Sequence, residues 1–499
     1  MSPKVKADKA AKTVEKTEEK QSLLESLLDE THVGRDDEEA YGIAKRGIEA
    51  FLGELLTSNK GKYEKIDRAA VDLMISEIDK RLEGQVNEFL HHKDVQKLES
   101  TWRSVRYLVD HTDFRENIKI ELMSATKQDL MDDFDDSPDI VKSGLYRTVY
   151  SAEYGTFGGQ PFGMILTDFE FAAGHEDIRL LQQLASVSAM AHAPLLANAK
   201  PTLFGGDEFA SLPAMRDLKA HFDSPQFARW RSFRENEDSR YIGLCMPRFM
   251  LRQPYAPGQN SVRAFEFEED VIDKHDNYLW GPASFALAAR CADSFANFRW
   301  CANIIGPQSG GAVEDLPLHQ YDAMGELQTK LPVEVQLTER REYELSEEGF
   351  IGLTHRKGSD NAAFFSANSV QRAKTFGKND KDSELNYRLG TQLPYMFIVS
   401  RVAHYLKVMQ RENLGTYQSK DRLQFELSWW LASYTTNTVA NDIEMAKYPF
   451  KESSVTVEDV PGVAGWFRIK MQLVPHFKYM GADFTLSLVG KLDKALNTD

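Results

Sequence analysis

The chain has 499 residues, of which 42% are hydrophobic and 11% aromatic, so it can bury sizeable cores and is not expected to be disordered over long stretches. Its 60 Lys and Arg against 76 Asp and Glu give a formal net charge of −16. This acid excess argues against nucleic acid as the main partner, because phosphate binding needs a basic surface. At roughly 150 residues per domain, the length predicts about three domains, or two large ones.

The cysteines and the N-terminus indicate the compartment. The three cysteines, at 245, 291 and 301, are widely spaced and form no CxxC, so their spacing suggests neither a zinc ribbon nor a redox pair. A reducing cytoplasm fits best. Residues 1–20 are rich in Lys and Glu and lack the apolar core of a signal peptide. No run of 18 apolar residues occurs, so membrane insertion is not expected.

A short leucine-faced helix is predicted directly after the charged tail. Ser22 and Glu25 form a capping-box pattern, in which the hydroxyl and the carboxylate satisfy early backbone amides. About eight residues are too few for a stable isolated helix, so its apolar face needs a partner. That partner is either the chain's own body or another protein. The apolar face consists of Leu23, Leu24, Leu27 and Leu28.

Helical periodicity continues to about residue 110, and strands alternate with helices beyond that point. Helices are predicted over 36–58, 67–90, from 94 onward, 128–134, 176–190 and 282–301. Strands are predicted over 117–123, 161–171, 241–246, 333–337, 342–345, 350–353 and 362–365.

The last part of the chain follows a polar stretch at 374–383. Two helices are predicted there, over 393–411 and 421–439, and three strands over 454–460, 466–474 and 484–489. Pro461 and Gly462 form a turn between the first two strands, which therefore predict an antiparallel meander. The sequence as a whole predicts an α+β, or mixed α/β, multi-domain protein.

A search for catalytic motifs finds no P-loop, dinucleotide fingerprint, zinc-protease motif or nucleophile elbow. Adjacent His91 and His92, with His111, are best interpreted as surface residues at helix ends. Asp168 and Glu170 lie on one face of a strand and could form an acid/base pair, although a strand-end turn is the simpler interpretation. The loops at 205–208 and 306–311 carry glycines typical of turns. No catalytic residue, metal site or cofactor is therefore predicted.

Aromatic and arginine residues are dense in two segments, which is typical of protein–protein contacts as well as of an ordinary core. With no catalytic motif present, this density favours a structural or assembly protein. The segments contain Phe227, Trp230, Arg231, Phe233 and Arg234, and Trp280, Phe295, Phe298, Arg299 and Trp300.

Several runs, in order along the chain, resemble those of the type VI secretion contractile sheath large subunit (the TssC/VipB, or EvpB, family). They lie at 102–109, 160–171, 197–204, 227–234, 240–248, 279–283, Pro317, 423–425 and 429–431. The resemblance extends from about Leu24 to Leu492. It implies a helical N-terminal arm, a phage-tail-sheath-like body and an antiparallel, β-rich C-terminal part, over residues 1–60, 61–373 and 384–499.

The resemblance also implies partners. Family members pair with a small subunit (TssB/VipA) and with further copies of themselves, and polymerise around a tube of Hcp on a baseplate. They contract to expel the tube, and the AAA+ ATPase ClpV then disassembles the sheath. The ATPase would bind the leucine-faced helix at 22–29. Strand exchange between protomers is expected at Trp466, Ile469, Met471 and Leu473.

Two alternatives to this function stay open at the level of sequence. The first is a phage-tail-like tubular sheath unrelated to secretion, which would not need the leucine-faced helix. The second is an acid/base enzyme that uses Asp168 and Glu170, which would require a deep pocket around the two carboxylates.

Overall fold

A computed structural model describes most of the chain after residue 67. The described residues are 42–43, 45–47, 50, 68–258, 265, 267–323, 325–374, 381–413, 419–437, 441–459 and 467–476. The chain forms two units, residues 1–82 and 83–499. Helix α3 (Arg68–Leu90) confirms the helix predicted over 67–90. The predicted helix at 22–29 lies outside the described residues, as does most of the one at 36–58.

The larger unit is built on a six-stranded mixed sheet with the order β1-β2-β3-β9-β10-β6. The first four strands are parallel, and the remaining pairs are antiparallel. Three central strands are buried along their whole length, as expected where helices cover both faces. The six strands are β1 (Ile165–Phe171), β2 (Leu195–Ala199), β3 (Ile242–Met246), β9 (Phe350–His355), β10 (Ala362–Phe364) and β6 (Ala312–Val313).

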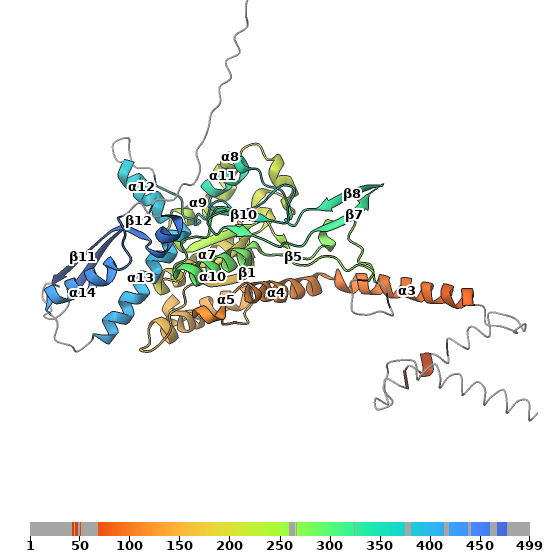
Figure 1. The fold of residues 1–499 in the computed structure, drawn as a ribbon, viewed down its shortest axis with the longest axis horizontal. Coiled ribbons are helices and arrows are strands. Elements are labelled where there is room, and N and C mark those ends of the chain that lie inside the picture. The colour runs from red at the N-terminus through yellow and green to blue at the C-terminus, as the bar shows by residue number, and fades with distance from the viewer. Residues whose placement is uncertain are drawn as a thin grey trace, which may run out of the picture. The chain divides into compact units, whose positions relative to one another are not determined.

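Successive side chains of the central strands point into two different cores. Leu195 and Phe350 belong to the first core, whereas their neighbours Leu196 and Ile351 belong to the second. The ring of Trp230 stacks on Phe350, with 5.7 Å between the ring centroids. The first core is covered by α7 (His175–Ala191) and α9 (Ala228–Glu235), and the second by α10 (Ala283–Phe298), on which α4 (Lys93–Asp110) packs (Figure 1).

Helix α10 fits the sheet closely because its first half consists mainly of small residues. Ala286, Ala288 and Ala289 are fully buried. The side chain of Asn198 on β2 accepts a hydrogen bond from the backbone N–H of Ser284 at 3.0 Å, so a strand residue satisfies one of the free amides at the helix start. The long, buried helix predicted over 282–301 is thereby confirmed.

The C-terminal part has its own apolar cluster, which includes Trp300 from the body, Leu427, Leu431 and Val457. Its two strands are antiparallel, and Asp459 is opposite Phe467 in the register. Figure 1 shows α14 beside β11, which it contacts. The elements are α12 (Lys381–Gly390), α13 (Leu393–Glu412), α14 (Lys420–Ala432), α15 (Asp442–Lys447), β11 (Phe450–Asp459) and β12 (Phe467–Pro475).

Three strand predictions are wrong. Residues 342–345 lie in helix α11 (Glu339–Glu347), because the Thr338 hydroxyl accepts a hydrogen bond from the N–H of Arg341 and so caps a helix there. Residues 117–123 form no strand with any described residue, and Asn117 at their start has φ 59°. In 333–337, a single bridge joins Val333 to Phe249. Apolar alternation alone cannot show whether a second strand is available.

The other helices and strands predicted over described residues agree with the structure in type. The mixed α+β class is confirmed, and α5 (Lys127–Asp136) matches the helix expected over 128–134. The helix predicted over 421–439 is shorter than expected, because α14 ends at Ala432. The third predicted C-terminal strand, at 484–489, lies outside the described residues.

Candidate interaction surfaces

The C-terminal strand pair carries the residues predicted for strand exchange. Ile469, Met471 and Leu473 alternate along β12 and pack against the C-terminal cluster, so their side chains face the chain's own core. Between them lie exposed residues, including Arg468 and Lys470. The face of β12 that carries Ile469, Met471 and Leu473 is thus covered by the chain's own cluster, and the opposite face is exposed. Trp466, the fourth predicted residue, lies outside the described residues.

The two strands differ in how their outer edges are occupied. Beside β11, Thr436 N–H donates to Phe450 C=O at 2.9 Å, and the Gln424 side chain accepts from Val457 N–H at 3.3 Å. For β12, the described part of the chain shows only β11 as a strand neighbour. A strand edge with unpaired N–H and C=O groups is a template for strand addition. Among the described strands of this pair, β12 is the more open one.

Helix α14 presents large apolar side chains on two faces. Leu427 and Leu431 are buried against β11, whereas Phe425 and Trp429 are 70% and 72% exposed. The neighbouring Trp430 turns inward and contacts Tyr405 and Tyr434 edge to face. The tryptophan pair noted in the sequence is thus split between a core and a surface. Sequence reasoning missed the exposed face, although the four-residue spacing of Phe425 and Trp429 could have revealed it.

Helices α3 and α4 also expose apolar residues. On α3, the 3-4 spacing typical of a helix-packing seam relates Ile75, Ile78 and Leu82, and Phe89 follows one heptad later. Each of these side chains is more than 40% exposed. On α4, Leu98 and Trp102 lie one turn apart and are about 60% exposed, although Leu108 on the same helix is buried.

A buried ion-pair network fixes α4 to the body. Arg252 donates to both Glu269 carboxylate oxygens at 2.5 and 3.0 Å, and to Glu99 on α4 at 2.9 Å. Arg103 adds a second hydrogen bond to Glu99 at 2.7 Å. Burial by itself would raise the pKa of Glu99, but the hydrogen bonds from Arg252 and Arg103 hold that pKa below its ordinary value.

The three histidines considered as metal ligands have separate structural roles. His91 Nε2 lies 3.3 Å from Glu269 Oε1, so it is a half-buried member of the ion-pair network and not a surface residue. His92 accepts from the N–H of Asp94 and caps the start of α4. The ring of His111 contacts that of Tyr107 in a tilted arrangement, with 4.1 Å between the centroids, at the other end of that helix. Among the described residues, no cluster of three or more potential metal ligands is found.

Asp168 and Glu170 both lie in β1, whose pairing with β2 is irregular between Leu166 and Glu170, and each carboxylate has its own polar surroundings. Thr101 on α4 donates to Asp168 at 2.7 Å. Burial raises the pKa of Glu170, which lies near Arg248 and Glu334. Arg248 donates to both oxygens of Glu334 at 2.7 and 2.8 Å. Burial alone would raise the pKa of Glu334, but the ion pair with Arg248 lowers it to about 2.

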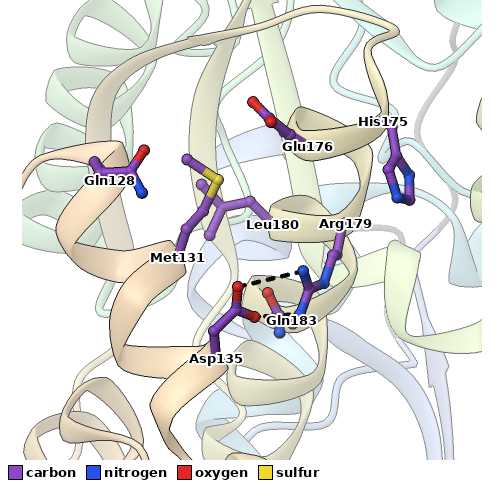
Figure 2. Close-up of a pocket in the computed structure, with 8 residues that line it drawn as sticks. All are labelled: Gln128, Met131, Asp135, His175, Glu176, Arg179, Leu180 and Gln183. Atoms are coloured by element: carbon purple, nitrogen blue, oxygen red, sulfur yellow. Dashed lines mark hydrogen bonds and ion pairs between the residues drawn. The ribbon is translucent and has the colours of Figure 1, made fainter.

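The pocket in Figure 2 lies elsewhere, between α5 and α7. Met131 and Leu180 are the apolar residues of its lining, and an ion pair between Asp135 and Arg179 lies within it. Neither Asp168 nor Glu170 contributes to this lining. The pocket therefore provides no support for an acid/base site at the two strand carboxylates.

The glycine loops are turns, as the sequence predicted. Gly205 has φ +81° and ends a short 3₁₀ helix. Gly310 has φ +94°, and a Cβ atom there would lie 2.2 Å from the carbonyl oxygen of Asn303. Only glycine fits this close approach of two backbone segments.

The aromatic and arginine segments mainly build the core. Trp230, Phe233 and Trp300 are at most 2% exposed. Arg234 is also buried, where it pairs with Glu348 at 2.5 Å and donates to the Glu347 carbonyl at 2.8 Å. Their density therefore reflects internal packing, whereas α3, α4 and α14 are among the elements that expose large apolar side chains.

Comparisons with known proteins assign the family. Residues 72–371 match the EvpB/VC_A0108 tail sheath N-terminal domain, and residues 382–492 match the EvpB/VC_A0108 tail sheath gpW/gp25-like domain. The chain is 38% identical over 438 residues to a Pseudomonas aeruginosa protein described as "Type VI secretion system sheath protein TssC1", which covers 85% of this chain and 86% of the relative. A membrane-spanning helix is not found in the part of the chain that the structure describes. The two domain matches and this similarity together show that the chain belongs to the type VI secretion sheath protein family, TssC/VipB.

Proposed function

We propose that this chain is the large subunit of a contractile sheath in the cytoplasm. In this proposal it pairs with a small sheath subunit (TssB/VipA), and the pairs polymerise with other copies into a tube around Hcp on a baseplate. Contraction then drives the inner tube outward. Residues 1–60 would act as a recognition arm, 61–373 as the sheath body and 384–499 as the connecting part.

The observation that carries this proposal is the outer edge of β12, which no other described strand pairs with. A two-stranded pair is marginal in water and gains stability when a further strand covers its edge. Here one face of the pair is already packed on the C-terminal cluster through Ile469, Met471 and Leu473. The register of an added strand would be favoured by this alternation of partly buried and exposed residues, because a one-residue shift exchanges the two faces.

Co-expression with a candidate small subunit, followed by negative-stain microscopy, tests the proposal. We expect tubes with cogwheel-like cross-sections when both proteins are present, and aggregates or amorphous material from this chain alone. Absence of tubes and of a co-purifying small subunit across a range of salt and pH would contradict the proposal. A monodisperse, unassembled chain would favour a different function.

The arm makes a separate prediction about disassembly. Leu23 and Leu27 lie one turn apart in the predicted helix, so a groove on the ATPase ClpV would bury both. Leu23→Asp combined with Leu27→Asp should abolish ATPase binding in a pull-down assay while tubes still form. Lys4→Glu with Lys6→Glu, in the charged tail, is the matched control. Unchanged binding by the leucine variant would place recognition elsewhere.

A further inference from the structure

Two cysteines that are ten residues apart in sequence meet at the end of α10. Cys291 lies in the helix. The helix ends at Phe298, and the N–H of the next residue, Arg299, donates to the Phe295 carbonyl at 2.8 Å. Arg299 has φ +68°, and this left-handed residue turns the chain back along the helix. The Cys301 thiol then lies 3.5 Å from the carbonyl oxygen of Cys291 and donates to it. The sequence spacing alone had suggested no redox pair.

The two thiols have different environments. Cys291 is 2% exposed, whereas Cys301 is only partly buried. A hydrogen bond from the Cys291 thiol, assisted by the charge of Arg401, lowers the pKa of Cys301, and the same interaction raises the pKa of Cys291. Cys301 therefore has more thiolate character and is more accessible, which are the properties of an oxidation-sensitive cysteine.

We propose that Cys301 and Cys291 form a peroxide-oxidisable dithiol pair. In the first step, the Cys301 thiolate attacks hydrogen peroxide, the O–O bond breaks, and after proton transfer the products are a sulfenic acid and water. In the second step, the Cys291 sulfur attacks the Cys301 sulfur, an S–S bond forms as the S–O bond breaks, and the departing hydroxide takes the Cys291 thiol proton and leaves as a second water. Two thiols are thus oxidised to one disulfide, and one peroxide is reduced.

The disulfide would act on the joint between the body and the C-terminal part. Trp300, next to Cys301, is 2% exposed and belongs to the C-terminal cluster. The guanidinium of Arg401 on α13 lies over the rings of Phe295 and Trp300, at 4.5 and 5.9 Å from their centroids. A covalent bond from Cys301 to α10 would fix the turn that carries Trp300. The inference rests on this local geometry and is independent of the proposed sheath function.

Peptide mapping can identify the bond directly, because tryptic cleavage after Arg290 and Arg299 places the two cysteines in separate peptides, 291–299 and 300–330. The full chain is treated with hydrogen peroxide, denatured in an alkylating reagent and digested. We expect loss of both alkylated peptides and gain of one linked species that dithiothreitol dissociates. Cys245, in the peptide 241–248, is the internal control, because burial raises its pKa and it is 1% exposed.

Variants separate the pair from general oxidation. Cys301→Ser should abolish the linked species, and Cys245→Ser should leave its yield unchanged. Cys291→Ser should leave a sulfenic acid on Cys301 that dimedone traps. Circular dichroism confirms that each variant is folded. Over-oxidation of Cys301 without a linked peptide, or a link that requires Cys245, would overturn the proposal.

Discussion

At the scale of single residues, the main feature of this chain is a set of buried ion pairs between segments far apart in sequence. Arg252 joins the body to Glu99 on α4, and Arg248 joins Glu334 to the region after β3. Removing a charge from water is costly, and only good geometry with a full set of hydrogen bonds offsets that cost. The Arg252 pair positions α4 on the body, and the Arg248 pair positions the segment of Glu334, more than either pair increases stability.

Arg252→Met should therefore be strongly destabilising, because it removes the buried positive charge that pairs with both Glu99 and Glu269. We expect a loss of about 3–5 kcal/mol in the free energy of unfolding, measured by urea denaturation of the full chain. Arg422→Met is the control, because Arg422 pairs with Glu426 on the surface of α14, where it should change stability by less than about 1 kcal/mol. Equal effects of the two variants would contradict the prediction.

His404 on α13 makes the chain sensitive to mild acid. Burial lowers the pKa of His404 to about 4, from an ordinary value of 6.5. Below pH 6.5 the unfolded chain binds a proton that the folded chain does not, so stability falls as the pH falls from about 6.5 to about 4. The full difference is on the order of 3 kcal/mol.

The test is His404→Gln, which keeps a side-chain donor near the Ala191 carbonyl that lies 2.9 Å from His404 Nε2. Urea midpoints measured between pH 7 and pH 4.5 should decrease less steeply for this variant than for the natural chain. Parallel pH profiles would show that His404 does not contribute to the acid sensitivity.

At the scale of elements, α14 and β12 each combine a packed face with an open one. Such elements are stabilised by their own core and still present a surface to another chain. The apolar residues of α14 lie all around the helix, so its sequence does not separate a core stripe from a surface stripe. The structure makes that separation, because β11 packs on the Leu427 and Leu431 side only.

The two faces of α14 should respond differently to substitution. Leu427→Ala should cost about 2–5 kcal/mol of unfolding free energy, because it opens a cavity against β11. Trp429→Ser, at a position that is 72% exposed, should change stability by no more than about 0.5 kcal/mol. Thermal unfolding of the two variants under identical conditions distinguishes them, and a large loss for Trp429→Ser would show that its exposed position is wrong.

At the scale of the whole molecule, the net charge of −16 bears on assembly. A chain with this charge, stacked many times in one tube, repels itself unless basic patches on neighbours or on the small subunit oppose it. The apolar and strand surfaces described above would then provide affinity, and charge would govern the rate and register of association.

Salt should consequently slow assembly. We expect light scattering of the two mixed subunits to rise more slowly as NaCl increases from about 50 to about 500 mM, because salt screens attraction between exposed charges beyond about 10 Å. Faster assembly at high salt would show that self-repulsion dominates and that complementary patches are absent.

Much of the fold could be predicted from local pattern. The buried helix α10, the strands β3 and β9 and the pair β11–β12 follow from apolar runs bounded by turn residues. Strand predictions failed at 117–123 and 333–337, because strand pairing depends on residues distant in the chain. The prediction at 342–345 failed because a single hydroxyl, that of Thr338, caps a helix there. The aromatic segments around Trp230 and Trp300 were compatible with a contact surface or with a core, and the structure shows a core, since local density does not reveal which residues the fold covers.

The sequence by itself determined the mixed α+β class, the resemblance to sheath proteins and the absence of known catalytic motifs, because these depend on composition, periodicity and the order of short runs. Tertiary structure alone decided that Asp168 and Glu170 are held in separate polar contacts, that β12 pairs with β11 alone among the described strands, and that Cys301 reaches back to Cys291. The physical reason is that burial, pKa and partner geometry arise from residues distant in the chain, which no local pattern contains.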